Sequence, residues 1–343
     1  MREKIKKLYN KHRILILGIS FVLLLFLPPL VKATVVKSNY FMDIIVRILF
    51  YVIFASSLNV INGYSGQFNI GHAGFMLIGA YTGALLATKA GLSFWFCLPI
   101  AGVFTAVVGF LVALPTLKLQ GIYLAIVTLG FSEIIRLVTL NWIGLTGGPL
   151  GVKNIPKVQL FGLKTSSPMV YYYIALGVVV ICLYCTYKVI NSRIGRAWMS
   201  IREDTTAAKS LGVEVRMYKA LNFMYGAFWA GVGGALMSPY YRFLSSDMFV
   251  TDEGFNVLAM VILGGQGTLI GPIVGAVMVN TITEVFRFAS EYRLVVYAIL
   301  IIVMMWCRPQ GLVGASNSVL AGGKLKKKVK KKTKENFVKE EGA

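Results

Sequence analysis

Several charged side chains that could do chemistry lie in pairs inside long apolar runs. Glu133 and Arg136 form one pair, and Glu284 and Arg287 form another, each spaced three residues apart. Side chains at that spacing share one face of a helix, so each pair could neutralise itself near the outer boundary of a membrane. Ionisable groups are costly inside apolar segments, which also makes them candidates for lining a solute path. There a glutamate would meet an ammonium group, and an arginine a carboxylate.

A second group of polar residues stands in two glycine-rich interruptions of the apolar pattern. "GYSGQFNIGHAG" runs from Gly63 to Gly74, and "GGQGTLIGPIVGA" runs from Gly264 to Ala276. A lone histidine such as His72 is more often a packed residue than a proton relay, so the polar cluster is a better path candidate than the histidine alone. The path candidates are Gln67, Asn69, His72, Glu133, Gln266, Thr268 and Glu284.

No catalytic or nucleotide-binding motif accompanies these residues. The sequence lacks G-x-S-x-G, H-E-x-x-H, an aspartate-rich pair that could hold magnesium, and G-x-x-x-x-G-K-[ST]. Its four cysteines lie in apolar segments without nearby histidines, and no second C-x-x-C accompanies Cys182 and Cys185, as expected of small buried hydrophobes. We therefore expect no enzyme, and neither a metal nor a cofactor bound by this chain. If ATP hydrolysis drives the activity of this chain, another polypeptide must bind magnesium and hydrolyse the ATP.

The composition is typical of a polytopic membrane protein. Of the 343 residues, 57% are hydrophobic and 14% are charged, and the mean hydropathy is +0.70. Most of the net charge of +21 comes from the two ends, "MREKIKKLYNKHR" and "KLKKKVKKKTK". A nucleic-acid-binding face would mix basic with aromatic residues. The ends are therefore interpreted as cytoplasmic topology determinants, with a specific anionic-lipid or nucleic-acid site as the less favoured alternative.

Membrane-spanning helices must position these residues. Apolar runs that span a bilayer, or nearly do so, occur at about 14–31, 42–62, 74–90, 95–115, 119–140, 170–190, 219–238, 253–265, 270–289 and 293–307. The first is interpreted as an uncleaved helix rather than a signal peptide, because no convincing small-residue cleavage site follows it. An even number of spans places both basic ends and the basic loop 191–219 in the cytoplasm, as the positive-inside rule requires.

These patterns predict an all-α polytopic membrane protein with about ten transmembrane helices and glycine-rich broken or re-entrant segments. Residues 1–13 form a basic cytoplasmic N-terminus, 14–313 the transmembrane domain, and 314–343 a lysine-rich, disordered cytoplasmic tail. Faint echoes between the two halves, "GQFNIG" with "GQGTLIG" and "SEIIR" with "TEVFR", are expected of transporters built from repeats. Their unequal spacing leaves this alignment open. Whether residues 253–289 cross the membrane fully is also open.

The basic loop contains "REDTTAAKSLGV", the most polar stretch between the outer spans. Asp204 or Thr205 can cap the start of a short helix, and Gly212 offers a left-handed stop. Helical spacing predicts that Ala207, Ala208 and Leu211 share one face. A helix of two turns is marginal alone in water, so it must dock on its own membrane domain or on a partner protein at the cytoplasmic face.

The segment Ala207-Ala208-x-x-x-Gly212 resembles the E-A-A-x-x-x-G coupling loop of bacterial ABC importer permeases, with Thr206 standing where the glutamate would be. Longer stretches extend the resemblance to the branched-chain amino acid importer permeases, specifically the LivM-type subunit, over residues 40 to 313. They are "SLNVINGYSGQFNIGHAGFMLIGAYTGALL" (57–86), "GIYLAIVTLGFSEIIRLV" (121–138), "TGGPLGV" (146–152), "SRIGRAWMSIREDTTAAKSLGVEVRMYKALNFMYGAFWAGVGGAL" (192–236) and "VILGGQGTLIGPIVGA" (261–276).

The resemblance implies a multi-pass subunit of the bacterial cytoplasmic membrane, surrounded by lipid, with both termini in the cytoplasm. It would form a path for leucine, isoleucine or valine with a second, LivH-like permease. Two cytoplasmic ABC ATPases would power it, and an extracytoplasmic binding protein would deliver the solute. The ATPases would be engaged by residues around the short helix: Glu203, Asp204, Thr206, Ala207, Ala208, Leu211 and Gly212.

Two alternatives remain open from the sequence. Related permeases of the branched-chain amino acid and ribose type serve urea, sugars or nucleosides, so the solute could differ. An ion-coupled secondary carrier would instead need no ATPase, and its proton or sodium dependence would trace to Glu133, Glu284 or His72. A lipid-modifying enzyme is disfavoured by the missing catalytic motifs.

Overall fold

The part of the chain that the structure describes is almost entirely helical. A computed structural model describes residues 38–285 except 118, 120, 161–162 and 165–167, together with residues 302 and 311–313. The predicted first span, 14–31, and both basic ends lie outside these residues. Of the predicted last span, 293–307, only residue 302 is described. The prediction of an all-α chain is confirmed for the described part.

The helices follow the predicted apolar runs in order. The long ones are α3 (Ser38–Asn59), continued by the π-helix η1 (Val60–Tyr64), α4 (His72–Thr88), α5 (Phe94–Thr116), α6 (Ile122–Asn141), α8 (Pro168–Ile190), α11 (Val215–Tyr241), α12 (Thr251–Gly264) and α13 (Gly271–Val285). Short helices connect them: α7 (Ile143–Thr146), η2 (Gly148–Leu150), α9 (Arg193–Glu203), α10 (Thr205–Ser210) and η3 (Ser246–Phe249).

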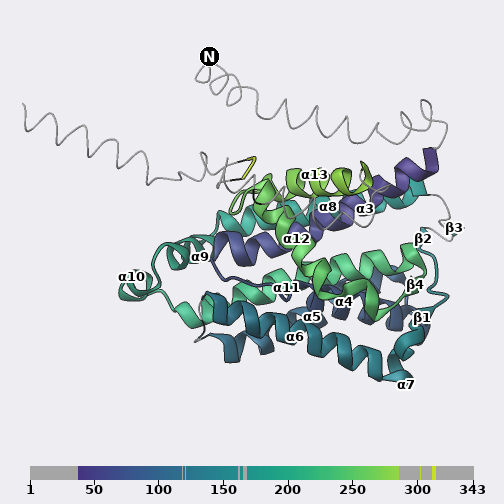
Figure 1. The fold of residues 1–343 in the computed structure, drawn as a ribbon, viewed down its shortest axis with the longest axis horizontal. Coiled ribbons are helices and arrows are strands. Elements are labelled where there is room, and N and C mark those ends of the chain that lie inside the picture. The colour runs from purple at the N-terminus through teal and green to yellow at the C-terminus, as the bar shows by residue number, and fades with distance from the viewer. Residues whose placement is uncertain are drawn as a thin grey trace, which may run out of the picture.

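Two minimal strand pairs complete the described chain. Strand β1 (Val152–Lys153) pairs antiparallel with β4 (Phe243–Leu244), and β2 (Gln159–Leu160) pairs antiparallel with β3 (Leu163–Lys164). Figure 1 shows these strands and α7 at one end of the helical body, with α9 and α10 projecting from the other. The long helices run between the two ends, so the connections gather on opposite sides, as in a protein that spans a membrane.

Four described helices are long and apolar enough to cross a membrane: Tyr40–Tyr64, Phe94–Thr116, Ile122–Asn141 and Pro168–Ile190. Helix α12 has 14 residues, a length of about 21 Å at the usual rise per residue. That is shorter than the roughly 30 Å hydrocarbon core of a bilayer. The sequence also indicated a short span here, and the count of ten is a prediction that the described residues do not settle.

Helix α11 lies against α4 and α5 and is the centre of the packing. Its Gly231 faces Gly79 of α4 so closely that a Cβ on Gly79 would lie 2.3 Å from the Cα of Gly231. A Cβ on Gly234 would lie 2.3 Å from the carbonyl oxygen of Met76. Small residues at such crossings let helix backbones approach, and dispersion contacts then stabilise association where lipid removes the hydrophobic driving force. The glycines of α4 and α11 therefore allow a close contact between the backbones of these two helices.

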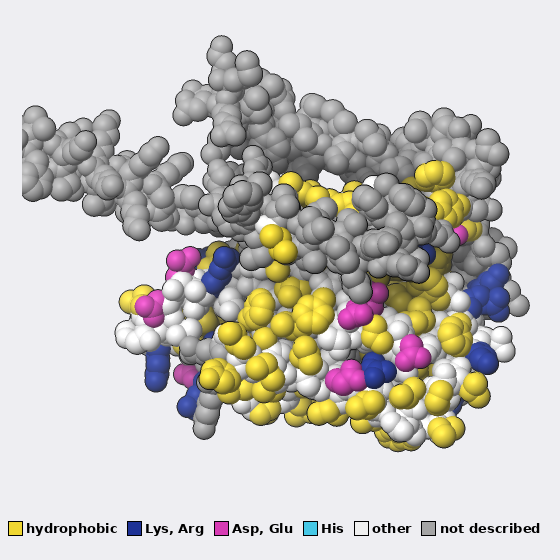
Figure 2. Space-filling view, viewed as in Figure 1, with side chains coloured by type: hydrophobic (Ala, Val, Ile, Leu, Met, Phe, Trp, Pro, Cys, Tyr) yellow, Lys and Arg dark blue, Asp and Glu magenta, His cyan; other side chains and the backbone are white. Residues whose placement is uncertain are grey.

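The lateral surface is apolar, as lipid contact requires. Phe96, Val103 and Leu111 of α5 are each more than half exposed. Figure 2 shows hydrophobic side chains over most of one face, with most of the lysines and arginines near its two ends. A few acidic side chains and a basic one interrupt this apolar face between the ends.

Candidate coupling site and translocation path

Helix α10 begins at a complete N-terminal cap. Oδ1 of Asp204 accepts hydrogen bonds from the backbone N–H groups of Thr206 at 2.7 Å and Ala207 at 3.0 Å. These donors otherwise have no partner in the first turn of a helix. By stabilising the carboxylate, the N–H groups of Ala207 and Thr206 lower the pKa of Asp204. The predicted cap at Asp204 is confirmed.

The other end of α10 is closed by a Schellman motif. Gly212 has φ of +80°, its N–H donates to the carbonyl of Lys209 at 3.0 Å, and the N–H of Val213 donates to the carbonyl of Ala208 at 3.1 Å. A residue with a Cβ would be strained in this left-handed conformation. The predicted stop at Gly212 is confirmed, and the two caps define a helix of six residues.

The three apolar residues for which the sequence predicts a shared face of α10 differ in their exposure. Ala208 is 2% exposed in a helix whose neighbours are α9 and α11, whereas Leu211 is 82% exposed and Ala207 is also exposed. Leu211 is already the C-terminal cap, at φ −86° and ψ +12°, so the helix ends before its side chain can turn inward. Glu203 and Thr206 are exposed too. That these three residues act as one face stays a prediction, and the exposed residues form a surface that faces solvent.

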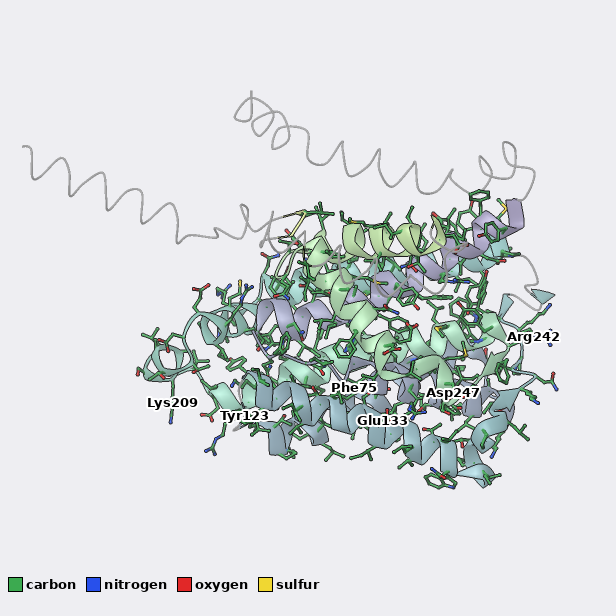
Figure 3. The ribbon with its side chains drawn as sticks, viewed as in Figure 1. Phe75, Tyr123, Glu133, Lys209, Arg242 and Asp247 are labelled. Atoms are coloured by element: carbon green, nitrogen blue, oxygen red, sulfur yellow. The ribbon has the colours of Figure 1, made fainter. Side chains whose placement is uncertain are left out.

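Helix α9 holds α10 against the membrane domain. Ser192 caps its start by accepting from the N–H of Ile194 at 3.2 Å. Trp198 is 1% exposed, and its Nε1–H donates to the carbonyl oxygen of Tyr218 on α11 at 2.8 Å. Figure 3 shows α9 and α10 at one end of the molecule, with Lys209 pointing outward. The loop is thus anchored by the buried Trp198, and the side of α10 that carries Lys209 is exposed.

Hydrogen bonds join the first glycine-rich break to neighbouring segments. Nε2 of Gln67 donates to Oδ1 of Asn222 at 3.1 Å and to the carbonyl of Lys219 at 3.3 Å. Asn69 exchanges two bonds with Asn62: its N–H donates to Oδ1 at 3.1 Å, and its carbonyl accepts from Nδ2 at 3.2 Å. The backbone freed by the break is therefore received by protein, as expected at membrane depth.

Two polar side chains in this break are buried without a partner. The amide of Asn69 and Nδ1 of His72 form no hydrogen bond with any described residue, and both residues are 0% exposed. The other ring nitrogen of His72 lies 2.8 Å from Oγ of Ser57, which donates its proton to the carbonyl of Phe54. Nε2 must then carry the hydrogen, which leaves Nδ1 as a bare acceptor in a neutral ring. Unsatisfied buried groups of this kind are uncommon in native structures.

The second break is a turn closed by its own threonine. Oγ1 of Thr268 donates to the carbonyl of Gly265 at 2.9 Å and accepts from the N–H of Gly271 at 3.0 Å, where α13 begins. Gln266 is half-buried in the same turn. The polar candidates of the two breaks thus lie in segments that the structure brings to the same end of the helical body. Their role along a path stays a prediction.

The predicted pairing of Glu133 with Arg136 is confirmed. Nε of Arg136 lies 3.1 Å from both carboxylate oxygens of Glu133, and Nη1 lies 3.5 Å from Asp247. Glu133 is the twelfth of the twenty residues of α6, so the pair lies near the middle of that helix rather than at its outer end. Figure 3 shows Glu133 and Asp247 on the side of the helical body, between its two ends. The pair is partly exposed on this side of α6. The sequence suggested a position near the membrane boundary because the two charges can neutralise each other there.

The second predicted pair is only half described. Glu284 lies at the end of the described part of α13 and accepts a hydrogen bond from the hydroxyl of Tyr40. Arg287 lies outside the described residues. Within the described part of the chain, no cluster of three or more His, Cys, Asp or Glu residues could hold a metal ion.

Comparison with known proteins decides the family. Residues 40–305 match the family described as "Branched-chain amino acid transport system / permease component". The chain belongs to this permease family. It is similar to the LivM-type subunits. One of them is the "High-affinity branched-chain amino acid transport system permease protein LivM" of Escherichia coli K12, which is 40% identical over 294 residues. The match covers 79% of this chain and 69% of that protein.

More distant similarities fit the same family. A probable LivM permease of Methanocaldococcus jannaschii is 24% identical over 311 residues, 77% of this chain and 90% of that protein. The LivH permease of Escherichia coli K12 is 24% identical over 293 residues, 77% of this chain and 91% of that protein. No solved structure matches the chain significantly. The resemblance to LivM-type permeases predicted from the sequence is confirmed.

Sequence reasoning missed two asparagines that organise the site of this LivM-type permease. Nδ2 of Asn222 donates to the carbonyl of Val60 at 3.0 Å, and Asn59 bonds the second break through both ends of its amide. Both asparagines lie in otherwise apolar helices, where polar side chains bridge neighbouring helices. Their position in the predicted spans was a signal that could have found them.

Proposed function

We propose that this LivM-type chain is one of two permease subunits of an ATP-driven importer for leucine, isoleucine and valine. The observation that carries the proposal is α10: a helix of six residues, capped at both ends, with Ala208 rooted in the domain and Leu211 82% exposed. A helix this short keeps its shape in water only with caps and a docking partner. Its exposed tip fits a cleft in a cytoplasmic ATPase.

The charged residues on the lateral face support a second permease as the neighbour there. Arg136 contacts both Glu133 and Asp247, and exposed apolar side chains such as Leu137 lie in the same helix. Lipid does not solvate such a cluster, whereas a facing protein with a water-filled path between the two does. Similarity to LivH as well as LivM agrees with a pair of related permeases. The acidic excess of the cluster suits the ammonium group of an amino acid.

Transport then works by alternating access. ATP binding to two ATPases closes them together and moves α10, and the helices next to the two glycine-rich breaks re-pack to open the path to one side or the other. The buried, unpartnered Asn69 amide and His72 Nδ1 mark a place where packing in the present state is incomplete. The subunit lies in the cytoplasmic membrane with both termini on the ATPase side, and a binding protein delivers the solute on the opposite side.

Substitutions in α10 test the coupling role. Ala208→Glu places a charge in the buried root, and Gly212→Val forces a branched side chain into a left-handed conformation. We expect both substitutions to reduce leucine uptake, and to reduce the stimulation of ATP hydrolysis by leucine, in proteoliposomes containing the whole complex. Gly144→Ala is the control, because its Cβ would meet nothing within 4 Å. Full coupling in assembled Ala208→Glu and Gly212→Val complexes would refute the role of α10.

A further inference from the structure

One side chain at the end of α9, Arg202, touches both glycine-rich breaks. Its Nη1 donates a hydrogen bond to the carbonyl oxygen of Gly63 in the first break. A Cβ built on Gly267 in the second break would lie 2.5 Å from the same nitrogen, and one on Gly66 would lie 3.0 Å from Cγ of Arg202. The guanidinium and its stem therefore fit where two glycines leave room for them.

The carbonyl that Arg202 meets lies at the C-terminal end of the continuous helix α3–η1. Carbonyls in the last turn of a helix have no partner within it and carry the negative end of its dipole. The carbonyl of Val60 accepts from Asn222 at 3.0 Å, and that of Ile61 accepts from the N–H of Gln67 at 3.2 Å. Arg202 is the charged donor among these three. A charge-assisted bond at this end is stronger than a neutral one.

The same helix end holds the second break. Oδ1 of Asn59 accepts from the N–H of Gly267 at 2.9 Å, and Nδ2 of Asn59 donates to the carbonyl of Thr268 at 2.9 Å. The two breaks are therefore joined to each other through Asn59 and to α9 through Arg202. Both bonds of Asn59 engage backbone groups of the turn, so a shift of the helix end moves the turn with it.

Arg202 is also closely connected to α10. It lies two residues before the capping Asp204, and α9 ends at Glu203 while α10 begins at Thr205. No flexible linker separates the guanidinium from the exposed helix. Helix α9 is held one turn earlier by Trp198, on the same side as Arg202. A displacement of α10 therefore acts on the end of α9 that carries Arg202.

We propose that Arg202 is the positioning residue that transmits movement of α10 to the two glycine-rich breaks. The proposal rests on the coupling function of α10 proposed above and names the next link. In the present structure the guanidinium holds the end of α3–η1 and the turn at Gly267 together. When α10 moves, the carbonyl of Gly63 follows the guanidinium, and Asn59 carries the second break along.

The test compares Arg202→Met and Arg202→Lys in the complete complex reconstituted in proteoliposomes. Methionine keeps the stem beside Gly66 and removes the donor, while lysine keeps the charge. Arg196→Met is the matched control: Arg196 lies on the same helix, is exposed, and donates to the carbonyl of Asn191 in its own connection. ATP hydrolysis and uptake of labelled leucine are measured on the same vesicles, with complex assembly checked by size-exclusion chromatography.

We expect Arg202→Met to assemble and hydrolyse ATP while leucine taken up per ATP falls about tenfold, as loss of a charge-assisted hydrogen bond predicts. Arg202→Lys should recover part of that ratio, and Arg196→Met should match the wild type. Gly267→Ala provides a second variant if Arg202→Met does not assemble, because its Cβ would displace Nη1. It should lower the same ratio.

Two results would overturn the inference. One is an uptake-to-ATP ratio within about twofold of the wild type in the assembled variant, smaller than a charge-assisted bond predicts. The other is a parallel loss of hydrolysis and uptake, which would make Arg202 a purely structural residue. A wild-type complex whose uptake needs no ATP would instead overturn the proposed function, so the two failures are distinguishable.

Discussion

The close backbone contact between α4 and α11 makes a quantitative prediction for Gly79→Ala. The new Cβ would lie 2.3 Å from both the Cα and the carbonyl oxygen of Gly231. Both are backbone atoms, so no side chain can rotate away, and α4 and α11 must separate by roughly 1 Å to restore ordinary van der Waals contact. The change therefore loosens the packing at the centre of the domain.

A matched substitution isolates the cost of that separation. Gly177 lies in the apolar helix α8, and a Cβ there would meet nothing within 4 Å. Alanine should stabilise the helix by about 1 kcal/mol at either position, while overpacking at Gly79 should cost about 1–3 kcal/mol. The difference in unfolding free energy between Gly79→Ala and Gly177→Ala therefore equals the packing cost alone.

The assay is unfolding of each purified variant in mixed micelles on titration with sodium dodecyl sulfate, followed by tryptophan fluorescence. We expect Gly79→Ala to unfold at a lower detergent fraction than the wild type or close to it, and Gly177→Ala at a higher one. Equal unfolding free energies for the two variants would refute the reasoning, because α4 and α11 would then not be in close contact.

Three further predictions follow from the cytoplasmic loop and the lateral face. Trp198→Phe keeps an apolar ring but removes the donor to Tyr218, and should cost about 1–2 kcal/mol in the same unfolding assay. Asp204→Ala should uncouple uptake from ATP hydrolysis, whereas Asp204→Asn, which still caps, should not. Because its folded pKa is lowered, the Asp204 cap stabilises α10 fully above the ordinary carboxyl pKa near 4 and is lost as pH falls through the lowered value. Coupling should thus be independent of this group between pH 5 and 8. Arg136→Gln leaves Glu133 without its partner and should lower leucine uptake, measured in proteoliposomes, more than Arg136→Lys does.

Much of the helical organisation could be predicted from the sequence. Apolar runs gave the order of the described helices, because length and hydropathy alone decide whether a segment suits a bilayer. The ends of α10 were also predictable: Asp204 and Gly212 act on backbone groups within three or four residues of themselves, so their effect is local. The i, i+3 pairing of Glu133 with Arg136 is local in the same sense.

Contacts between distant segments could not be predicted in this way. The sequence left open whether α10 docks on its own domain or on a partner, and only the tertiary structure shows that Ala208 is buried while Leu211 is exposed. The bridge from Arg202 to Gly63 joins residues far apart in the chain, as do the bonds from Asn59 to the turn at Gly267. A single sequence shows that these residues are polar and the glycines small, but not that they meet.

The central claim is that this chain carries branched-chain amino acids only as part of an ATP-driven complex. The most direct test reconstitutes the chain with a second permease, both ATPases and the binding protein, and measures uptake of labelled leucine with isoleucine and valine as competitors. Omitting any one component, or replacing ATP by a non-hydrolysable analogue, should reduce uptake to background. ATP-independent uptake by this chain alone, driven by a proton or sodium gradient, would contradict the account.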